Sequence, residues 1–216
     1  MEADATIGHF NIIKSLDKVH MKRGALIGSM NWISANLTGF NPKTVDLSVR
    51  ERIPCLLLGK FASVSSRHYL DCSDSITIDD FTDLAGIRSV LLSHHMNVKL
   101  GTQMCQPIVI GKNCFIGTNC VILGGAGLPD YSILAAGAVL VEYPEESFVL
   151  YAGTPAVRKK VYDRTIGWFN RSPSEILLSR KRWSANPWGQ ASGKTDPLGG
   201  SGRFIDARRN EIDEER

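Results

Sequence analysis

Six aliphatic residues recur at a constant spacing of six in the middle of the chain. They are Ile110, Ile116, Ile122, Leu128, Leu134 and Leu140. A strand alternates every two residues and a helix repeats every 3.6 or so, and neither period produces this spacing. A period of six is typical of hexapeptide repeats, in which three short strands make one coil of a parallel β-helix. The spacing therefore predicts an all-β solenoid with these side chains in its core.

The residue two positions before each of the last five aliphatic residues is small. These residues are Cys114, Cys120, Ala126, Ser132 and Ala138. Side chains two apart on a strand share one face, so this residue also points into the narrow solenoid interior. Gly111 and Gly117 follow aliphatic residues, where a tight corner favours glycine. The two patterns together support the solenoid over residues 107–142.

The same spacing recurs upstream with more interruptions. It links Leu58, Val64 and Leu70, then Ile78, Leu84 and Val90, and near the start Ile7, Ile13, Val19 and Ala25. Eight residues separate Leu70 from Ile78, which indicates a bulge at one corner. The pattern predicts coils at about 7–33, 58–96 and 108–142, with loops at 34–57 and 97–106. Residues 1–160 would then form one β-helix domain.

The composition changes after the coils. Ser172, Pro173 and Glu175 fit the first positions of a helix with a capping box, and we expect that helix over 173–183. Residues 161–183 would form a C-terminal segment that contains this helix. Residues 184–216 are rich in glycine and then in charge, which predicts a linker and a flexible tail.

Charge and cysteine content narrow the function classes. The net charge of +3, with both signs interspersed, gives no reason to expect nucleic acid as a partner, and no apolar run reaches the length of a transmembrane segment. The five cysteines include no CxxC pair, which predicts reduced thiols and a cytoplasmic protein. Cys114 and Cys120 should be buried and inert, whereas Cys105, in the second loop, should be accessible and reactive.

The segment "PIVIGKNCFIGTNCVIL", followed by "SILAAGAVLVEYPEESFVLYAGTPAVRKK", resembles the hexapeptide-repeat acyltransferases, including the maltose, galactoside and polysaccharide O-acetyltransferases. The resemblance covers residues 58–160 well and 7–33 weakly. It implies a left-handed parallel β-helix, a homotrimer and acetyl-CoA as the donor, without a metal. The left hand comes from the resemblance alone, because it departs from the usual right-handed crossover.

Two histidines are candidates for the catalytic base. The resemblance implies a histidine about a dozen residues before the P-I-x-I-G segment, and it favours His94, which follows a serine, over His95. If the inward phase of Val90 continued unbroken, however, His94 would point inward and His95 outward. Asp83 is our choice for a carboxylate that orients the imidazole, although the acids near it could equally be solvated corner residues.

The expected chemistry requires a base because a sugar hydroxyl is a poor nucleophile at neutral pH. An imidazole with a pKa near ~6.5 can take the hydroxyl proton as the acceptor attacks the thioester. It can then return a proton to the departing thiolate of CoA.

The resemblance also implies a binding surface for CoA. The matching residues are Gly117, Thr118, Ala135, Ala136 and Gly137 for the pantetheine arm, with Pro155, Arg158 and Lys160 beside the nucleotide. The chain departs from its relatives at Glu142, where a carboxylate would repel a phosphate.

Several other readings remain open at this level. The acetyl group could go to the amine of an amino sugar instead of a sugar or polysaccharide hydroxyl. A zinc enzyme resembling the γ-class carbonic anhydrases would use His68, His94 and His95. A β-helix without catalytic activity, used for assembly, would not bind CoA.

Overall fold

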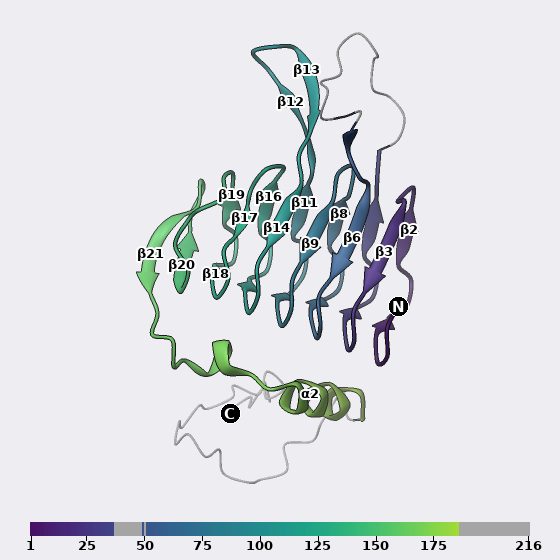
Figure 1. Ribbon diagram of the computed structural model, residues 1–216, viewed down its shortest axis with the longest axis vertical. Coiled ribbons are helices and arrows are strands. Elements are labelled where there is room, and N and C mark those ends of the chain that lie inside the picture. The colour runs from purple at the N-terminus through teal and green to yellow at the C-terminus, as the bar shows by residue number, and fades with distance from the viewer. Residues whose placement is uncertain (37–48, 50, 186–216) are drawn as a thin grey trace, which may run out of the picture. The chain divides into compact units, whose positions relative to one another are not determined.

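The computed structural model describes residues 1–36, 49 and 51–185. Within them, three parallel sheets run along a β-helix, and each coil contributes one short strand to each sheet (Figure 1). Sheet A contains β1 (Thr6–Ile7), β4 (Leu26–Ile27), β7 (Ser63–Val64), β10 (Asp83–Leu84), β15 (Phe115–Ile116), β18 (Ile133–Leu134), β20 (Val149–Ala152) and the antiparallel β21 (Val157–Val161). Sheet B contains β2 (Ile12–Lys14), β5 (Trp32–Ser34), β8 (Tyr69–Asp71), β11 (Val90–Leu92), β16 (Val121–Leu123) and β19 (Val139–Leu140). Sheet C contains β3 (Lys18–Met21), β6 (Cys55–Leu58), β9 (Ile76–Ile78), β14 (Ile108–Ile110) and β17 (Gly127–Leu128).

The fold is the expected left-handed parallel β-helix, and its core is the predicted aliphatic set. All six aliphatic residues between 110 and 140 are buried in one hydrophobic cluster. Cys114, Cys120, Ala126, Ser132 and Ala138 are also buried, as the small-residue pattern predicts. Desolvation raises the pKa of the Cys114 thiol to about 12 and also raises that of Cys120, which supports their expected inertness.

The inward phase is wrong at two upstream points. Leu91, not Val90, lies in the core, because β11 pairs Leu91 with Leu70 on one side and Ile122 on the other. Near the N-terminus, Met21 and Ile27 take the aliphatic positions, and Val19 and Ala25 lie two residues before them. Both shifts arise because corners contain extra residues that an unbroken count of six ignores.

Most departures from the six-residue spacing lie at one edge of the solenoid, where the chain passes from sheet B to sheet C. We call it the B–C edge. Extra residues lie there between β2 and β3 and between β8 and β9, and the segment between β5 and β6 leaves the coils there. Most of that segment (37–48 and 50) lies outside the described residues.

The second predicted loop is also at the B–C edge, but it is not irregular. Residues 94–105 form an antiparallel hairpin of β12 (His94–Asn97) and β13 (Thr102–Cys105), which projects from the coils (Figure 1). This pairing buries Cys105 at the hairpin base and leaves it 1% exposed, and burial raises the pKa of its thiol. The expectation of an accessible, reactive Cys105 is therefore wrong.

A ladder of polar side chains runs through the interior at the N-terminal ends of the sheet B strands, away from the B–C edge. The Asn31 side-chain oxygen accepts the backbone N–H of His68 at 2.8 Å, and His68 Nδ1 accepts the N–H of Ser89 at 3.1 Å. The Ser89 hydroxyl donates to the carbonyl of Gly117 at 3.3 Å on the next coil. Nδ1 of His68 must be unprotonated to accept the hydrogen bond from Ser89. Burial lowers the pKa of His68 to about 4, which favours this neutral form.

His68 should make the fold sensitive to acid. Its folded pKa of about 4 lies below the ordinary 6.5, so its contribution to stability is complete above pH 6.5 and is lost as the pH falls towards 4. The shift corresponds to about 3 kcal/mol of unfolding free energy. Urea titrations at several pH values should show a shallower acid dependence for His68→Asn, because asparagine fills the same ladder position at Asn31. If the pH dependence of this variant equals that of the wild type, His68 is not the source of the acid sensitivity.

The C-terminal segment packs on the outer face of sheet A. The ring of Trp168, in the 3₁₀ helix η1 (Gly167–Asn170), meets Phe115 edge-on with 4.8 Å between centroids. Arg171 pairs with Asp83 at 2.8 Å and stacks on Trp168. Met1–Leu178 accordingly form one compact unit, and the second unit is Ser179–Arg216.

The expected C-terminal helix is present as α2 (Pro173–Ala185). Its capping box is confirmed, because Glu175 accepts the N–H of Ser172 at 2.7 Å and the Ser172 hydroxyl accepts the N–H of Glu175 at 3.3 Å. The predicted tail beyond residue 185 lies outside the described residues. None of the helices described has the length and apolarity needed to cross a membrane.

Candidate active site

His94 is the first residue of the hairpin at the B–C edge. Leu91 is inward, so Ser93 points inward and is fully buried, and His94 falls on the outward side. This removes the conflict between the two sequence arguments, because both now place His94 outside the core. The imidazole is about one third exposed (32%) and can still be reached by a substrate.

The partner of His94 is Asp71, at the end of β8. His94 Nδ1 and Asp71 Oδ2 form a short hydrogen bond. The carboxylate is 3% exposed, and its other oxygen accepts the N–H and the hydroxyl of Ser73 at 3.0 and 2.5 Å. Ser93 also donates to the backbone carbonyl of Asp71 at 2.6 Å, which ties the hairpin base to β8. The aspartate is therefore fixed in position and leaves Nε2 of His94 as the ring nitrogen directed away from it.

The contact between His94 and Asp71 shifts the pKa of both side chains. The hydrogen bond with Asp71 raises the pKa of His94, and the negative charge of Asp71 raises it further. Burial and the positive charge of Arg52 oppose this rise. Burial alone would raise the pKa of Asp71, but hydrogen bonds from His94 and Ser73 and the charge of His94 outweigh burial, so its pKa is lowered. The pair thus stabilises a protonated imidazole beside an ionised carboxylate, which suits a base that gains a proton during a reaction.

The carboxylate that contacts His94 is not Asp83, which was chosen from the sequence. Asp83 lies on the outer face of sheet A, where it accepts the hydroxyl of Ser63 at 2.5 Å and pairs with Arg171. Its partners are therefore part of the contact between sheet A and the C-terminal segment. No obvious motif marks Asp71, which meets His94 only through the stacking of successive coils.

The two faces of the hairpin separate His94 from His95. Directly opposed residues of an antiparallel pair share a face, so His94 lies beside Cys105 and His95 beside Met104. Burial raises the pKa of the Cys105 thiol, and Arg52, a residue that sequence reasoning did not single out, opposes this rise. His95 is half-buried, and its Nδ1 makes no hydrogen bond among the described residues.

The five residues predicted to line the pantetheine arm lie on another edge, between sheets A and B. We call it the A–B edge. Gly117 and Thr118 follow β15, Ala135, Ala136 and Gly137 follow β18, and the Gly137 N–H donates to the Thr118 carbonyl at 2.9 Å. A Cβ on Gly117 would lie 2.6 Å from the backbone nitrogen of Ala136, so the close stacking of coils already requires this glycine.

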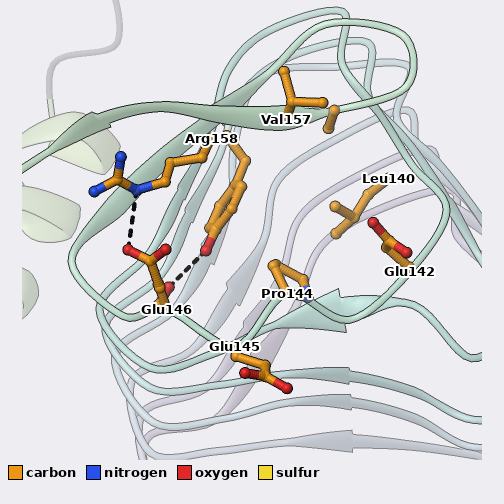
Figure 2. A pocket seen from close by; sticks show the side chains of 9 residues that line it. Leu140, Glu142, Pro144, Glu145, Glu146, Val157 and Arg158 are labelled. Carbon is orange, nitrogen blue, oxygen red and sulfur yellow. Dashed lines mark hydrogen bonds and ion pairs between the residues drawn. The ribbon is translucent and has the colours of Figure 1, made fainter.

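The residues predicted beside the nucleotide lie in the last hairpin, β20–β21. Arg158 is already paired with Glu146 at 3.0 Å, and the Lys160 ammonium lies 4.9 Å from the ring centre of Tyr162. Pro155 follows the cis peptide bond at the turn. An open cavity of about 360 Å³ lies beside this hairpin (Figure 2). It is lined by Leu140, Glu142, Pro144, Glu145, Glu146, Tyr151, Ala156, Val157 and Arg158. Three carboxylates against one arginine make this cavity unfavourable for a phosphate.

A single chain does not bring the two predicted halves of the site together. His94 follows the C-terminal end of a sheet B strand, whereas Gly117–Thr118 and Ala135–Gly137 precede sheet B strands. One strand and its flanking corners separate them, which is roughly 10–20 Å. The described residues also contain no group of three His, Cys, Asp or Glu side chains arranged to hold a metal ion.

Known proteins resemble part of the chain. Residues 107–142 match a family described as "Hexapeptide repeat of succinyl-transferase". The chain is 40% identical over 72 residues to 2,3,4,5-tetrahydropyridine-2,6-dicarboxylate N-acetyltransferase of Brevibacillus brevis, covering 33% of this chain and 28% of that protein. It is 29% identical over 85 residues to the bifunctional protein GlmU of Wolbachia pipientis wMel, covering 36% and 20%. The chain thus spans less than a third of either relative, and residues 107–142 are hexapeptide repeats.

Among solved structures, the chain is similar to a hexapeptide-repeat-containing acetyltransferase of Vibrio cholerae in complex with acetyl coenzyme A. The TM-score is 0.45, with 19% identity over 74% of this chain and 73% of that chain.

Proposed function

We propose that the chain is an acyltransferase that moves an acetyl group from acetyl-CoA to a hydroxyl of a sugar or polysaccharide. The observation that carries the proposal is the pair His94–Asp71, a partly exposed imidazole fixed by a buried carboxylate. It lies at the B–C edge, where the insertions gather, and insertions of solenoid proteins often form the binding face. The relative named as an N-acetyltransferase supports acyl transfer as the reaction class.

His94 acts as the general base in this proposal. Its Nε2 takes the proton of the acceptor hydroxyl while the oxygen forms a bond to the carbonyl carbon of the thioester. The C–S bond then breaks, and the same proton passes from His94 to the thiolate, so an ester and a free thiol result. Asp71 keeps the proton of the neutral imidazole on Nδ1 and stabilises the imidazolium that forms between the two steps.

The proposal includes a homotrimer. The predicted CoA residues and His94 lie on different edges, so a second chain could supply the A–B edge that faces His94. Symmetric assembly of identical chains provides such a repeated contact. Light scattering should give about three chain masses, and a monomer would exclude a site shared between chains. A cytoplasmic location, which five cysteines without a disulfide bond favour, is also part of the proposal.

The direct test is acetyl-CoA consumption with a panel of sugars and oligosaccharides. Consumption that depends on a hydroxyl acceptor supports the proposal, and its absence across the panel together with absent CoA binding would favour a non-catalytic β-helix. The second candidate is transfer to an amine, which the name of the N-acetyltransferase relative favours. An amino sugar should then be the better acceptor, and loss of His94 should matter less.

The contact with Asp71 predicts the pH dependence of the reaction. The pKa of His94 is raised, so the acidic limb of kcat/KM should lie above the ~6.5 of a free imidazole. Asp71→Asn removes the carboxylate, so this limb should move to lower pH and kcat should fall. Asp83→Asn is the matched control, because Asp83 contacts Arg171 instead, and it should leave the limb in place. A shift caused by the Asp83 variant alone would restore the original choice from the sequence.

A further inference from the structure

The A–B edge carries two arginines above the residues predicted to bind CoA. Its corners stack in register, because the N–H of Arg88 donates to the Arg67 carbonyl at 3.0 Å and the N–H of Asn119 donates to the Ile87 carbonyl at 2.9 Å. The same ladder continues to Gly137 on the next coil. Arg67 and Arg88 are therefore neighbours on successive coils, with backbones roughly 5 Å apart.

Both arginines are exposed, and no carboxylate among the described residues lies within ion-pair distance of either. Two positive charges held on neighbouring coils repel each other, so this arrangement costs stability unless an anion lies between them. Of the two basic residues proposed beside the nucleotide, Arg158 is paired with Glu146, and the Lys160 ammonium lies over the ring of Tyr162. Arg67 and Arg88 are thus two positive charges on the edge predicted to bind CoA, and no carboxylate of the described residues neutralises them.

Local structure gives no reason for arginine at these positions. Both residues have a positive φ, 61° for Arg67 and 62° for Arg88, a conformation that favours glycine and asparagine. The equivalent corners of the other coils use Phe10, Met30, Asn119 and Gly137, with φ of 58°, 61°, 58° and 72°, and none of these side chains carries a charge. Because the side chains are exposed, core packing does not explain them either. Their charge is the property that remains.

We propose that Arg67 and Arg88 together bind one anionic group, a phosphate or a carboxylate, of a substrate of this enzyme. Guanidinium groups on adjacent coils can each donate two hydrogen bonds to the oxygens of such a group. The inference rests on the proposed acyl transfer for the identity of the anion, which would be a phosphate of acetyl-CoA or an acidic group on the acceptor. The recognition chemistry is the same in both cases.

The test compares wild type with the double variant Arg67→Gln/Arg88→Gln. The matched control is Lys60→Gln/Lys112→Gln, which removes two exposed positive charges from corners between sheets C and A. Calorimetry should measure CoA, pantetheine and inorganic pyrophosphate with all three proteins. Loss of charge-assisted hydrogen bonds should weaken anion binding by roughly 10–100-fold in the arginine variant and little in the control.

The outcomes separate the two sources of the anion. If the arginine variant binds CoA more weakly than the wild type but binds pantetheine equally well, the arginines bind a phosphate of CoA. If CoA binding is unchanged and KM rises for an acidic acceptor but not for a neutral one, they bind the acceptor. If CoA affinity, the KM for an acidic acceptor and pyrophosphate affinity are all the same as in the lysine control, the arginines are merely solvated and the inference is wrong. Failure of acyl transfer itself would appear instead as absent CoA binding and turnover in the wild type, and the pyrophosphate titration would still decide the question for the arginine pair.

Discussion

Replacement of His94 by alanine is expected to lower kcat by ~10²–10⁴-fold, the effect of removing a general base. The KM for acetyl-CoA should change little, because the residues predicted to hold the cofactor belong to the A–B edge and do not include His94. Steady-state kinetics at saturating acetyl-CoA would measure both constants. The variant must first be shown to have the assembly state of the wild type.

His95→Ala is the matched control for this prediction. His95 lies on the opposite face of the hairpin from His94 and Cys105, so its removal should affect kcat by only a few fold. A large effect in His95→Ala with a small one in His94→Ala would reverse the assignment. Small effects in both would point to an amine acceptor, and full activity in both would remove histidine from the mechanism.

Leu91→Asp is expected to prevent stable folding. Leu91 is fully buried between Leu70 and Ile122, and an unpaired carboxylate there would cost several kcal/mol, comparable to the stability of a typical domain. Val90→Asp is the control on the adjacent residue, which faces outward and is half-buried. Circular dichroism and urea unfolding should show a folded Val90 variant and an unfolded or aggregated Leu91 variant. The opposite result would mean that the inward phase of this coil is Val90 after all.

This pair of variants bears on how far the sequence specifies the fold. The period of six and the small residue two positions before five of the six aliphatic residues predict the coils over 107–142, because both patterns follow from a narrow interior. The same small-residue rule could have located Leu91, since Ser89 lies two residues before it, whereas Arg88 lies two residues before Val90. A count of six residues from Leu84 reaches Val90 instead of Leu91, because the corner between them contains an extra residue.

The site was only partly predictable. His94 could be chosen from its place before residues 107–110, but its partner Asp71 lies 23 residues away and meets it through coil stacking. Asp83 was chosen from the sequence instead, and its actual partner, Arg171, is 88 residues distant in a segment outside the repeats. Cys105 was misjudged because the strand pairing of residues 94–105 has no signal in a polar, loop-like segment. Tertiary contacts, which no local pattern encodes, decide all three positions.

The most direct test of the account is activity recovered by mixing two inactive variants. His94→Ala removes the base, and Ala136→Phe places a large ring on the exposed A–B edge, where it should block the pantetheine arm. If the site forms between chains of a trimer, random co-assembly gives about a quarter of the interfaces an intact His94 facing an intact edge. The account predicts that each variant alone is inactive and that the mixture regains about this share of wild-type activity. No recovery in mixed trimers of demonstrated composition would contradict the site shared between His94 and the A–B edge.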